Sequence, residues 1–194
     1  MYDSLRAHIA KYIELSEEEF SRCTALFIPK KIRKKAFLLQ EGDVCRHLAF
    51  VTEGCLRSYT VDPKGDEHVV QFAIEGWWIS DLFSFLTGEP GVFYIDALEN
   101  SEMLLIDRAS YEKLCTDVPK FERFFRMILQ NNYIATHRRI SATLSMSAEE
   151  QYLRFVASFP DIVKRVSQLH IASYLGITPE ALSRIRKNLS AKKP

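Results

Sequence analysis

Residues 166–189 read VSQLHIASYLGITPEALSRIRKNL, and this stretch decides the fold of the last part of the chain. Ser167 is a favourable helix N-cap, and apolar residues recur behind it at helical spacing. Gly176 then ends the helix, since glycine readily adopts the left-handed conformation found there. Thr178 is a second N-cap, and Pro179 suits a first helical position, where its missing N–H needs no partner. The spacing predicts a helix-turn-helix.

The second predicted helix has one apolar and one polar face. Its apolar residues Ala181, Leu182, Ile185 and Leu189 are expected to be buried. The opposite face can hydrogen-bond base edges or phosphates if the helix enters a major groove. The candidate DNA-binding residues are Gln168, Thr178, Glu180, Ser183, Arg184 and Lys187. The first two of these begin the two helices, where phosphates dock favourably.

The charge distribution supports double-stranded DNA as the partner. The formal net charge of the chain is only +1, yet the segment from Lys164 to the C-terminus holds seven basic residues and one acidic residue, Glu180. A concentrated basic end on an otherwise acidic protein is typical of a phosphate-binding surface. A solvated basic tail is the alternative, but it does not explain why the apolar spacing, the Gly turn and the Thr-Pro start fall in register.

The preceding part of the chain predicts an α+β fold. Two short helices are expected first, about Leu5 to Tyr12 and one begun by a capping box of Ser16 and Glu19. Short β-type runs follow at a spacing of roughly 8–12 residues, which indicates a sandwich or barrel. These runs are FIPKKI, AFLLQEG, HLAFVTEG, CLRSYTVD, EHVVQFAI, VFYIDALE and EMLLID.

A long helix is expected next, from Pro119 to Ser145, and it would be about 40 Å long. Its apolar positions form two flanks, which implies two packing partners: the β domain, and the same helix of a second subunit in a homodimer. The alternative is a monomer whose helix spans both domains. We therefore expect domains at 1–118, 119–146 and 147–194, the last beginning with a helix at about Ala148 to Ser158. The apolar positions are Phe124, Phe125, Ile128, Leu129, Tyr133, Ile134, Ile140 and Leu144.

A β region containing EGDVCRHLAFVTEGCLRSY, a long helix and then SQLHIASYLGITPEALSRIRKNL resembles, in that order, the Crp–Fnr family of transcription regulators. The resemblance covers nearly the whole chain. It implies a homodimer with an N-terminal jelly-roll-like β roll of the cyclic-nucleotide-binding type, a dimerisation helix, a C-terminal helix-turn-helix, and RNA polymerase as a partner. The family's recognition helix often bears S/T-R-E-T-x-x-R, whose Glu and second Arg read bases. Glu180 and Arg184 match, whereas Pro179 replaces the first Arg, so a different DNA sequence is expected.

Two departures from the family pattern concern the effector and the chain end. The cyclic-AMP phosphate cassette is replaced around Ser80 and Asp81, and no Lys or Arg occurs between Asp66 and Asp107, so a bound phosphate would lack a cation. We therefore expect a different effector or none. A small neutral effector could be held by Trp78, Asp81, Phe83 and Phe93, although such aromatic residues more often form core. The family's β-hairpin wing is expected to be absent or replaced by Lys192 and Lys193.

Other classes of function are disfavoured. His47 and His68 lie twenty-one positions apart, too far for the tight His-x-His pair of a cupin-type metal enzyme, and no nucleophile motif or P-loop occurs. The four cysteines show no CxxC pair, so no metal or other cofactor is expected. No signal peptide or membrane-spanning run is found, so the protein is expected to be cytoplasmic. The remaining alternative is an effector-binding or protein-interaction module, which mutation of Arg184 would distinguish from a DNA reader.

Overall fold

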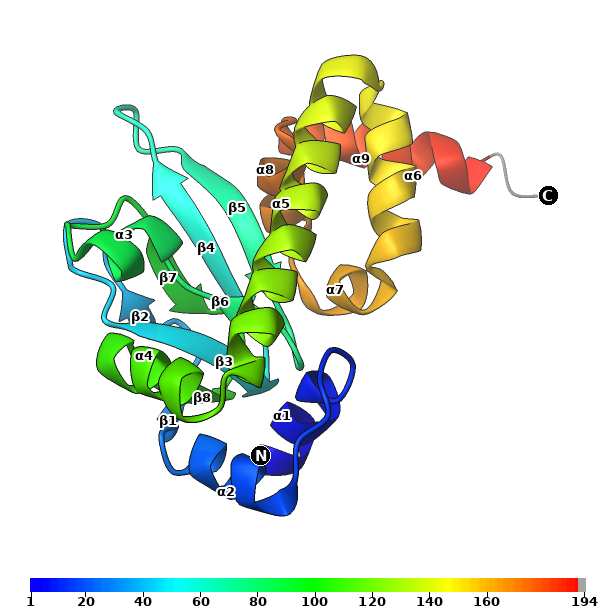
Figure 1. Ribbon diagram of the computed structural model, residues 1–194. Coiled ribbons are helices and arrows are strands. Elements are labelled where there is room, and N and C mark those ends of the chain that lie inside the picture. The colour runs from blue at the N-terminus through cyan, green and yellow to red at the C-terminus, as the bar shows by residue number, and fades with distance from the viewer. Residues whose placement is uncertain (192–194) are drawn as a thin grey trace.

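The β strands of the computed structural model, which describes residues 1–191, form two four-stranded antiparallel sheets. Their orders are β1-β8-β3-β6 and β2-β7-β4-β5, and the two sheets face each other as a β roll (Figure 1). The predicted tail lysines, Lys192 and Lys193, lie outside the described residues. The strands are β1 (Ile28–Ile32), β2 (Phe37–Leu39), β3 (His47–Glu53), β4 (Leu56–Val61), β5 (Glu67–Ala73), β6 (Trp78–Ile79), β7 (Tyr94–Ala97) and β8 (Ser101–Asp107).

Helices precede, interrupt and follow the roll. In Figure 1, α1 and α2 lie at the foot of the roll, α4 leads into α5, and α5 runs from the roll to the unit formed by α6 to α9. The helices are α1 (Tyr2–Ile9), α2 (Glu17–Thr24), α3 (Leu82–Thr87), α4 (Arg108–Asp117), α5 (Lys120–Ser145), α6 (Ala148–Ser158), α7 (Pro160–Arg165), α8 (Gln168–Leu175) and α9 (Pro179–Ala191). The α+β fold with a C-terminal helix-turn-helix is confirmed.

Several predicted elements need correction. The first helix begins at Tyr2 and ends at Ile9, three residues earlier than predicted, because Leu5 and Ile9 enter the core and the chain turns at Ala10. Four elements were not predicted, namely β6, α3, α4 and α7. Each of these elements has at most ten residues, too few for a clear periodic pattern. The start of α4 could not be recognised because its N-cap, Asp107, is also the last residue of strand β8. The capping box of Ser16 and Glu19 is present as predicted.

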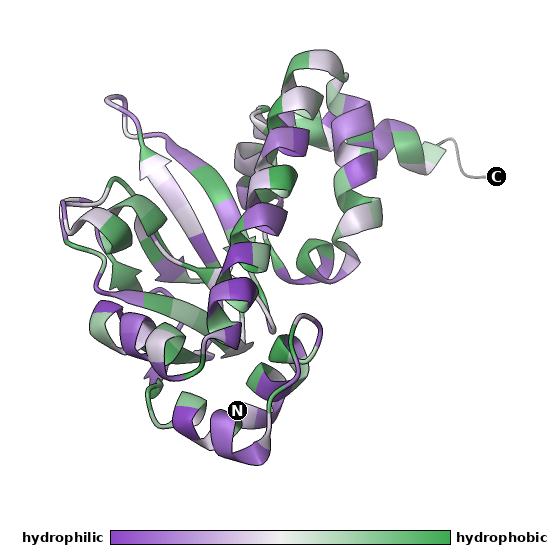
Figure 2. Ribbon diagram, viewed as in Figure 1, coloured by the Kyte–Doolittle hydropathy of each residue, from purple (hydrophilic) through white to green (hydrophobic). Residues whose placement is uncertain are grey.

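One hydrophobic core fills the roll and fastens the first turns of α5 to it. Phe121 and Phe124 of α5 are fully buried in the same hydrophobic cluster as Phe50 of β3. Farther along, every residue from 129 to 138 is exposed. Figure 2 shows that hydrophobic and hydrophilic bands alternate along α5, including the length beyond the roll. The middle of this helix therefore presents apolar side chains that no other part of residues 1–191 covers.

A second core joins the roll to the C-terminal helices. It lies between the outer face of β4 and β5 and the helices α6 to α9, so the two parts of the chain share one hydrophobic cluster. No helix among the described residues is both long and apolar enough to cross a bilayer. The buried members of this core are Cys55, Tyr59, Val69, Phe72, Tyr152, Phe155, Ile162, Val166, Ile171, Ala172, Leu175 and Leu182.

Candidate nucleic-acid interface

The turn between α8 and α9 has the geometry that its sequence predicts. The Ser167 hydroxyl accepts a hydrogen bond from the backbone N–H of His170, and Thr178 Oγ1 accepts one from Ala181 N–H at 3.2 Å. Gly176 ends α8 with a φ of 69°, a left-handed conformation that favours glycine. Each helix is thus ended or begun by a local contact, and the turn holds α8 and α9 at a defined angle.

Helix α9 buries one face and exposes the other. Leu182 is fully buried, and Ile185 and Leu189 pack partly buried against the second core. The opposite face presents exposed side chains at positions i, i+3, i+4 and i+7, which share one helical face. These residues are Glu180, Ser183, Arg184 and Lys187, all predicted to touch DNA.

The charges of this face are unpaired. Neither Glu180 nor Arg184 takes part in an ion pair within residues 1–191, so the surface pairing of these two side chains is not formed. Lys187 is exposed and unpaired over the same part of the chain. The carboxylate, the guanidinium and the ammonium group therefore keep their hydrogen-bonding capacity for another molecule.

The two predicted residues at the helix starts differ in accessibility. Thr178 is exposed beside α9, although its hydroxyl accepts the capping hydrogen bond. Gln168 is half-buried, and its side-chain carbonyl oxygen is enclosed without a hydrogen-bond partner. Of the six candidate residues, five are therefore brought together on the accessible surface, and Gln168 lies partly beneath it.

The basic charge of this region is smaller than its sequence suggests. Arg165 points inward and pairs with Glu75 and Glu99 of the β roll. Lys164 is exposed but lies 3.4 Å from the carboxylate of Asp161. The cations of the described region that remain available to a phosphate are concentrated on α9.

The four residues proposed to line an effector pocket have different surroundings. Trp78 packs among the rings of Phe50, Phe124 and Phe125 in the first core. Phe83 is 56% exposed on α3, and Phe93 is half-buried in the loop before β7.

Asp81, the fourth of these residues, is fully buried and used within its own loop. One carboxylate oxygen accepts the N–H of Ser84 at 3.1 Å, and the other accepts the N–H of Val92 at 3.0 Å. The same carboxylate lies so close to Gly91 that a Cβ there would be 2.8 Å from Asp81 Oδ2. An internal anion therefore occupies the backbone donors of the segment that replaces the phosphate cassette.

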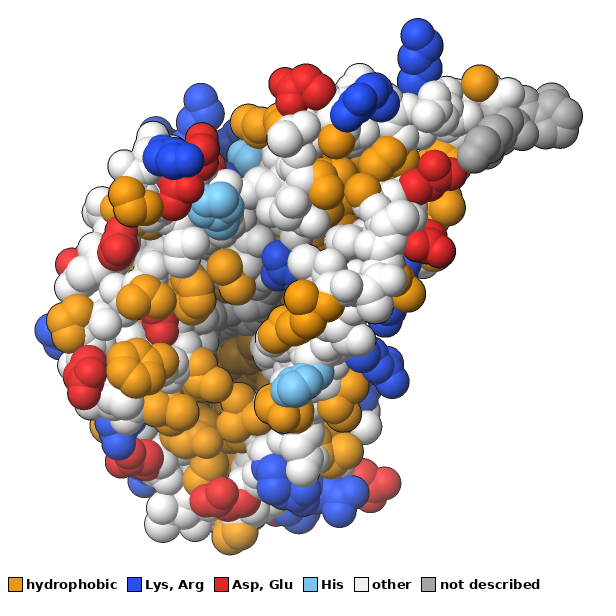
Figure 3. All heavy atoms as spheres, turned by 90° about the horizontal axis from the view of Figure 1, so that it is seen from above, with side chains coloured by type: hydrophobic (Ala, Val, Ile, Leu, Met, Phe, Trp, Pro, Cys, Tyr) orange, Lys and Arg blue, Asp and Glu red, His pale blue; other side chains and the backbone are white. Residues whose placement is uncertain are grey.

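A different hollow lies beside α5. Its volume is about 650 Å³, and it is lined by residues of α4 and α5, including Tyr111, Leu129, Tyr133 and Ile134. In the view from above, hydrophobic side chains gather around a hollow between the roll and α5 (Figure 3). None of the four proposed pocket residues lines this hollow.

The four cysteines are free thiols and lie buried inside the protein. Burial raises the pKa of the Cys23 and Cys55 thiols to about 12 and that of Cys115 to about 11. Burial also raises the pKa of Cys45. Thiols with raised pKa values are poor nucleophiles and metal ligands at neutral pH. Among residues 1–191, no group of three or more His, Cys, Asp and Glu side chains is placed to hold a metal ion.

Comparisons with known proteins agree with this architecture. Residues 29–117 match the cyclic nucleotide-binding domain family. The chain is 27% identical over 185 residues to the regulatory protein HlyX of Actinobacillus pleuropneumoniae, covering 88% of this chain and 75% of that protein. It is 28% identical over 188 residues to the fumarate and nitrate reduction regulatory protein of Vibrio cholerae, covering 88% and 72%.

Among solved structures, FixK2 from Bradyrhizobium japonicum superposes with a TM-score of 0.75 at 18% sequence identity. The superposition covers 86% of this chain and 85% of FixK2. At that identity the likeness shows the fold, with its β roll, long helix and helix-turn-helix.

Proposed function

Because the chain is a member of the Crp–Fnr family of transcription regulators, we propose that it binds specific DNA sequences as a homodimer. Helix α9 enters the major groove, and its exposed face reads the bases. The observation that carries this proposal is the exposed polar face of α9, formed by Glu180, Ser183, Arg184 and Lys187, whose charged groups form no ion pair within residues 1–191.

Each side chain of that face has a role set by its chemistry. Arg184 donates two hydrogen bonds to O6 and N7 of a guanine, and Glu180 accepts one from N4 of a cytosine. Ser183 and Lys187 bind the phosphate backbone, as does Thr178 at the start of α9. Gln168, at the start of α8, would bind a phosphate once its side chain turns outward.

The second subunit covers the exposed part of α5. Ten consecutive residues, 129–138, are exposed on every side of the helix, and they include Leu129, Tyr133 and Ile134. Isolated helical turns that expose apolar side chains are marginal in water, because most helix stability comes from packing an apolar face. The same face continues to Ile140 and Leu144. Pairing α5 of two copies about a two-fold axis buries it and spaces two recognition helices for two half-sites.

The effector, if the protein has one, is not cyclic AMP. A cyclic nucleotide needs donors for its phosphate, and the carboxylate of Asp81 already accepts the N–H groups of Ser84 and Val92. No Lys or Arg lies between Asp66 and Asp107 to replace them. Placing a phosphate beside a buried carboxylate without a cation would be strongly unfavourable.

Other parts of the proposal come from the family. The relatives are named as regulatory proteins, which agrees with a non-catalytic role. RNA polymerase is the expected protein partner, and binding to chromosomal DNA implies a cytoplasmic location.

The test is selection of bound fragments from the source genome with the purified protein, followed by a salt titration of the best fragment. We expect a two-fold-symmetric site whose recognition is lost in Arg184→Ala. The matched control is Arg33→Ala, which removes the same charge from an exposed position directly after β1, outside the helix-turn-helix. Weak, sequence-indifferent binding by all three proteins would overturn the proposal and favour a protein-interaction module.

A further inference from the structure

Strand β5 is an edge strand whose outer backbone groups are covered by the C-terminal half of the chain. An edge strand leaves a row of unpaired N–H and C=O groups. Here the Ser173 hydroxyl of α8 accepts the N–H of Val69 at 2.9 Å and donates to the C=O of Glu67 at 2.6 Å. Helix α8 thus takes the place of a neighbouring strand along β5.

Arg139 of α5 completes this contact from a third element. Its guanidinium donates to the carbonyl oxygens of Val69 and Val70 on β5 and to that of Tyr174 on α8. Its guanidinium carbon also lies over the Tyr174 ring, 3.9 Å from the ring centroid. Burial lowers the pKa of Arg139 from its ordinary value. One side chain therefore joins the long helix, the roll and the helix-turn-helix.

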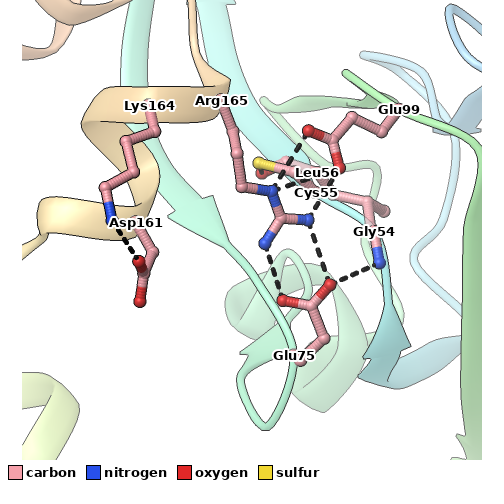
Figure 4. Close-up of polar contacts among 8 residues, drawn as sticks. All are labelled: Gly54, Cys55, Leu56, Glu75, Glu99, Asp161, Lys164 and Arg165. Atoms are coloured by element: carbon pink, nitrogen blue, oxygen red, sulfur yellow. Dashed lines mark hydrogen bonds and ion pairs between the residues drawn. The ribbon is translucent and has the colours of Figure 1, made fainter.

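A second attachment lies at the other end of α8, just before its N-cap. Arg165 ends α7, and its guanidinium donates to both carboxylate oxygens of Glu75, at 2.7 and 3.0 Å. It also donates to Glu99, with the shortest contact at 2.7 Å. Figure 4 shows the two carboxylates converging on this one guanidinium from different turns of the roll. Glu75 is held in place by the N–H of Gly54, 2.8 Å from its Oε1.

We propose that Arg165 is a positioning residue for DNA binding, which fixes α8 and α9 relative to the roll by its pairing with Glu75 and Glu99. This inference rests on the proposed function. Arg165 does not bind phosphate in this arrangement, although it belongs to the basic end of the chain. Its partners lie 90 and 66 positions earlier, in the turn before β6 and the turn after β7.

The place of Arg165 in the chain makes this attachment effective. Only Val166 and Ser167 separate it from α8, and Val166 is buried in the second core. Because so little chain separates Arg165 from α8, a displacement of the turn that holds Glu75 or Glu99 also displaces the start of α8. Bidentate Arg–carboxylate pairs define orientation as well as distance, which lysine would not do.

The experiment compares Arg165→Ala and the double variant Glu75→Gln/Glu99→Gln with the wild type, using the selected DNA site over a range of salt concentrations. The matched control is Lys164→Ala, which removes a neighbouring charge that contacts only Asp161 in Figure 4. A positioning role predicts that both test variants bind the DNA site about tenfold more weakly than the wild type. The slope of the logarithm of the binding constant against the logarithm of the salt concentration, called the salt slope below, should be unchanged. Lys164→Ala should bind within about threefold of the wild type, as expected for an exposed charge.

The double variant separates positioning from direct phosphate contact. It removes two negative charges and frees Arg165, so a phosphate-binding Arg165 would strengthen DNA binding. In that case Arg165→Ala would also lower the salt slope by about one. Either result overturns the proposal.

A measurement without DNA separates this proposal from the proposed function. Spin labels on Glu41→Cys in the roll and Asn188→Cys in α9 report the distance between the two parts, since the four native cysteines are buried. Labelled chains are diluted with an excess of unlabelled chain, so that a dimer carries one labelled subunit. We then expect one narrow distance distribution in the wild type and a broad or displaced one in Arg165→Ala. Unchanged distances in Arg165→Ala overturn the attachment even if DNA binds. If no variant binds DNA but the distances change as expected, the proposed function fails and the attachment stands.

Discussion

Replacing Leu144 by alanine tests whether the apolar face of α5 binds a second copy. Leu144 is 82% exposed in the single chain, so most of its surface is still available for burial. Complete burial of a leucine side chain is worth about 1.5–3 kcal/mol, and the available part is worth roughly 2 kcal/mol. A two-fold dimer contains the residue twice, so the substitution should cost about 4 kcal/mol of association energy. That corresponds to a dissociation constant about a thousandfold higher.

Sedimentation equilibrium over a wide concentration range measures this constant directly. The matched control is Leu86→Ala on α3, also an exposed leucine at 45% but far from the α5 face, and its dimerisation should equal that of the wild type. Folding of the single chain should change by no more than about 0.5 kcal/mol, because alanine is a good helix former and the lost side chain faces solvent.

Two results would refute the reasoning about α5. One is a wild-type protein that sediments as a monomer at every concentration. The other is a dimer whose dissociation constant changes less than tenfold in Leu144→Ala. In either case the exposed turns of α5 do not form the subunit interface.

Three further predictions concern stability. Gly54 has a φ of +96°, and a Cβ there would lie 2.3 Å from Ser101 Oγ, so Gly54→Ala should cost about 3 kcal/mol or more in urea unfolding. Gly65→Ala, with a φ of +91° and open space around it, should cost only about 1 kcal/mol, and equal losses would contradict this account. Burial lowers the pKa of His8 from 6.5 to about 4, so the unfolded chain takes up the proton first and stability falls as pH drops from 6.5 towards 4. His8→Phe should remove that contribution, at most about 1.4 kcal/mol per pH unit, and an identical pH profile would exclude it. Ser147→Ala removes the capping box of α6 and should lower stability by about 1 kcal/mol in thermal unfolding, whereas no change would show that the box contributes nothing.

The helix-turn-helix could be predicted because its signals are local. The N-caps Ser167 and Thr178 accept hydrogen bonds from N–H groups three residues ahead, and Gly176 supplies its conformation from its own backbone. Interactions within three or four residues are legible in sequence order. The polar face of α9 follows from the same periodicity.

The proposed effector residues show the opposite case. Trp78 has the same aromatic character in a pocket wall as in a core, and its ring partners come from β3 and α5, distant in the chain. The carboxylate of Asp81 is bound by the N–H of Val92, eleven positions later. Neither assignment can be made from neighbouring residues, because burial depends on which elements meet.

By itself, the sequence determined the kinds of elements and their order: the β runs, the long helix, the two capped helices and the basic character of α9. These depend on hydrophobic periodicity and on contacts within one turn. Only the tertiary structure decided how the parts are joined. It turned Arg165 away from the DNA-facing charges towards Glu75 and Glu99, and it placed α8 along the open edge of β5. Such choices join residues 66 to 106 positions apart. They follow from satisfying buried charges and edge-strand hydrogen bonds, which no local pattern encodes.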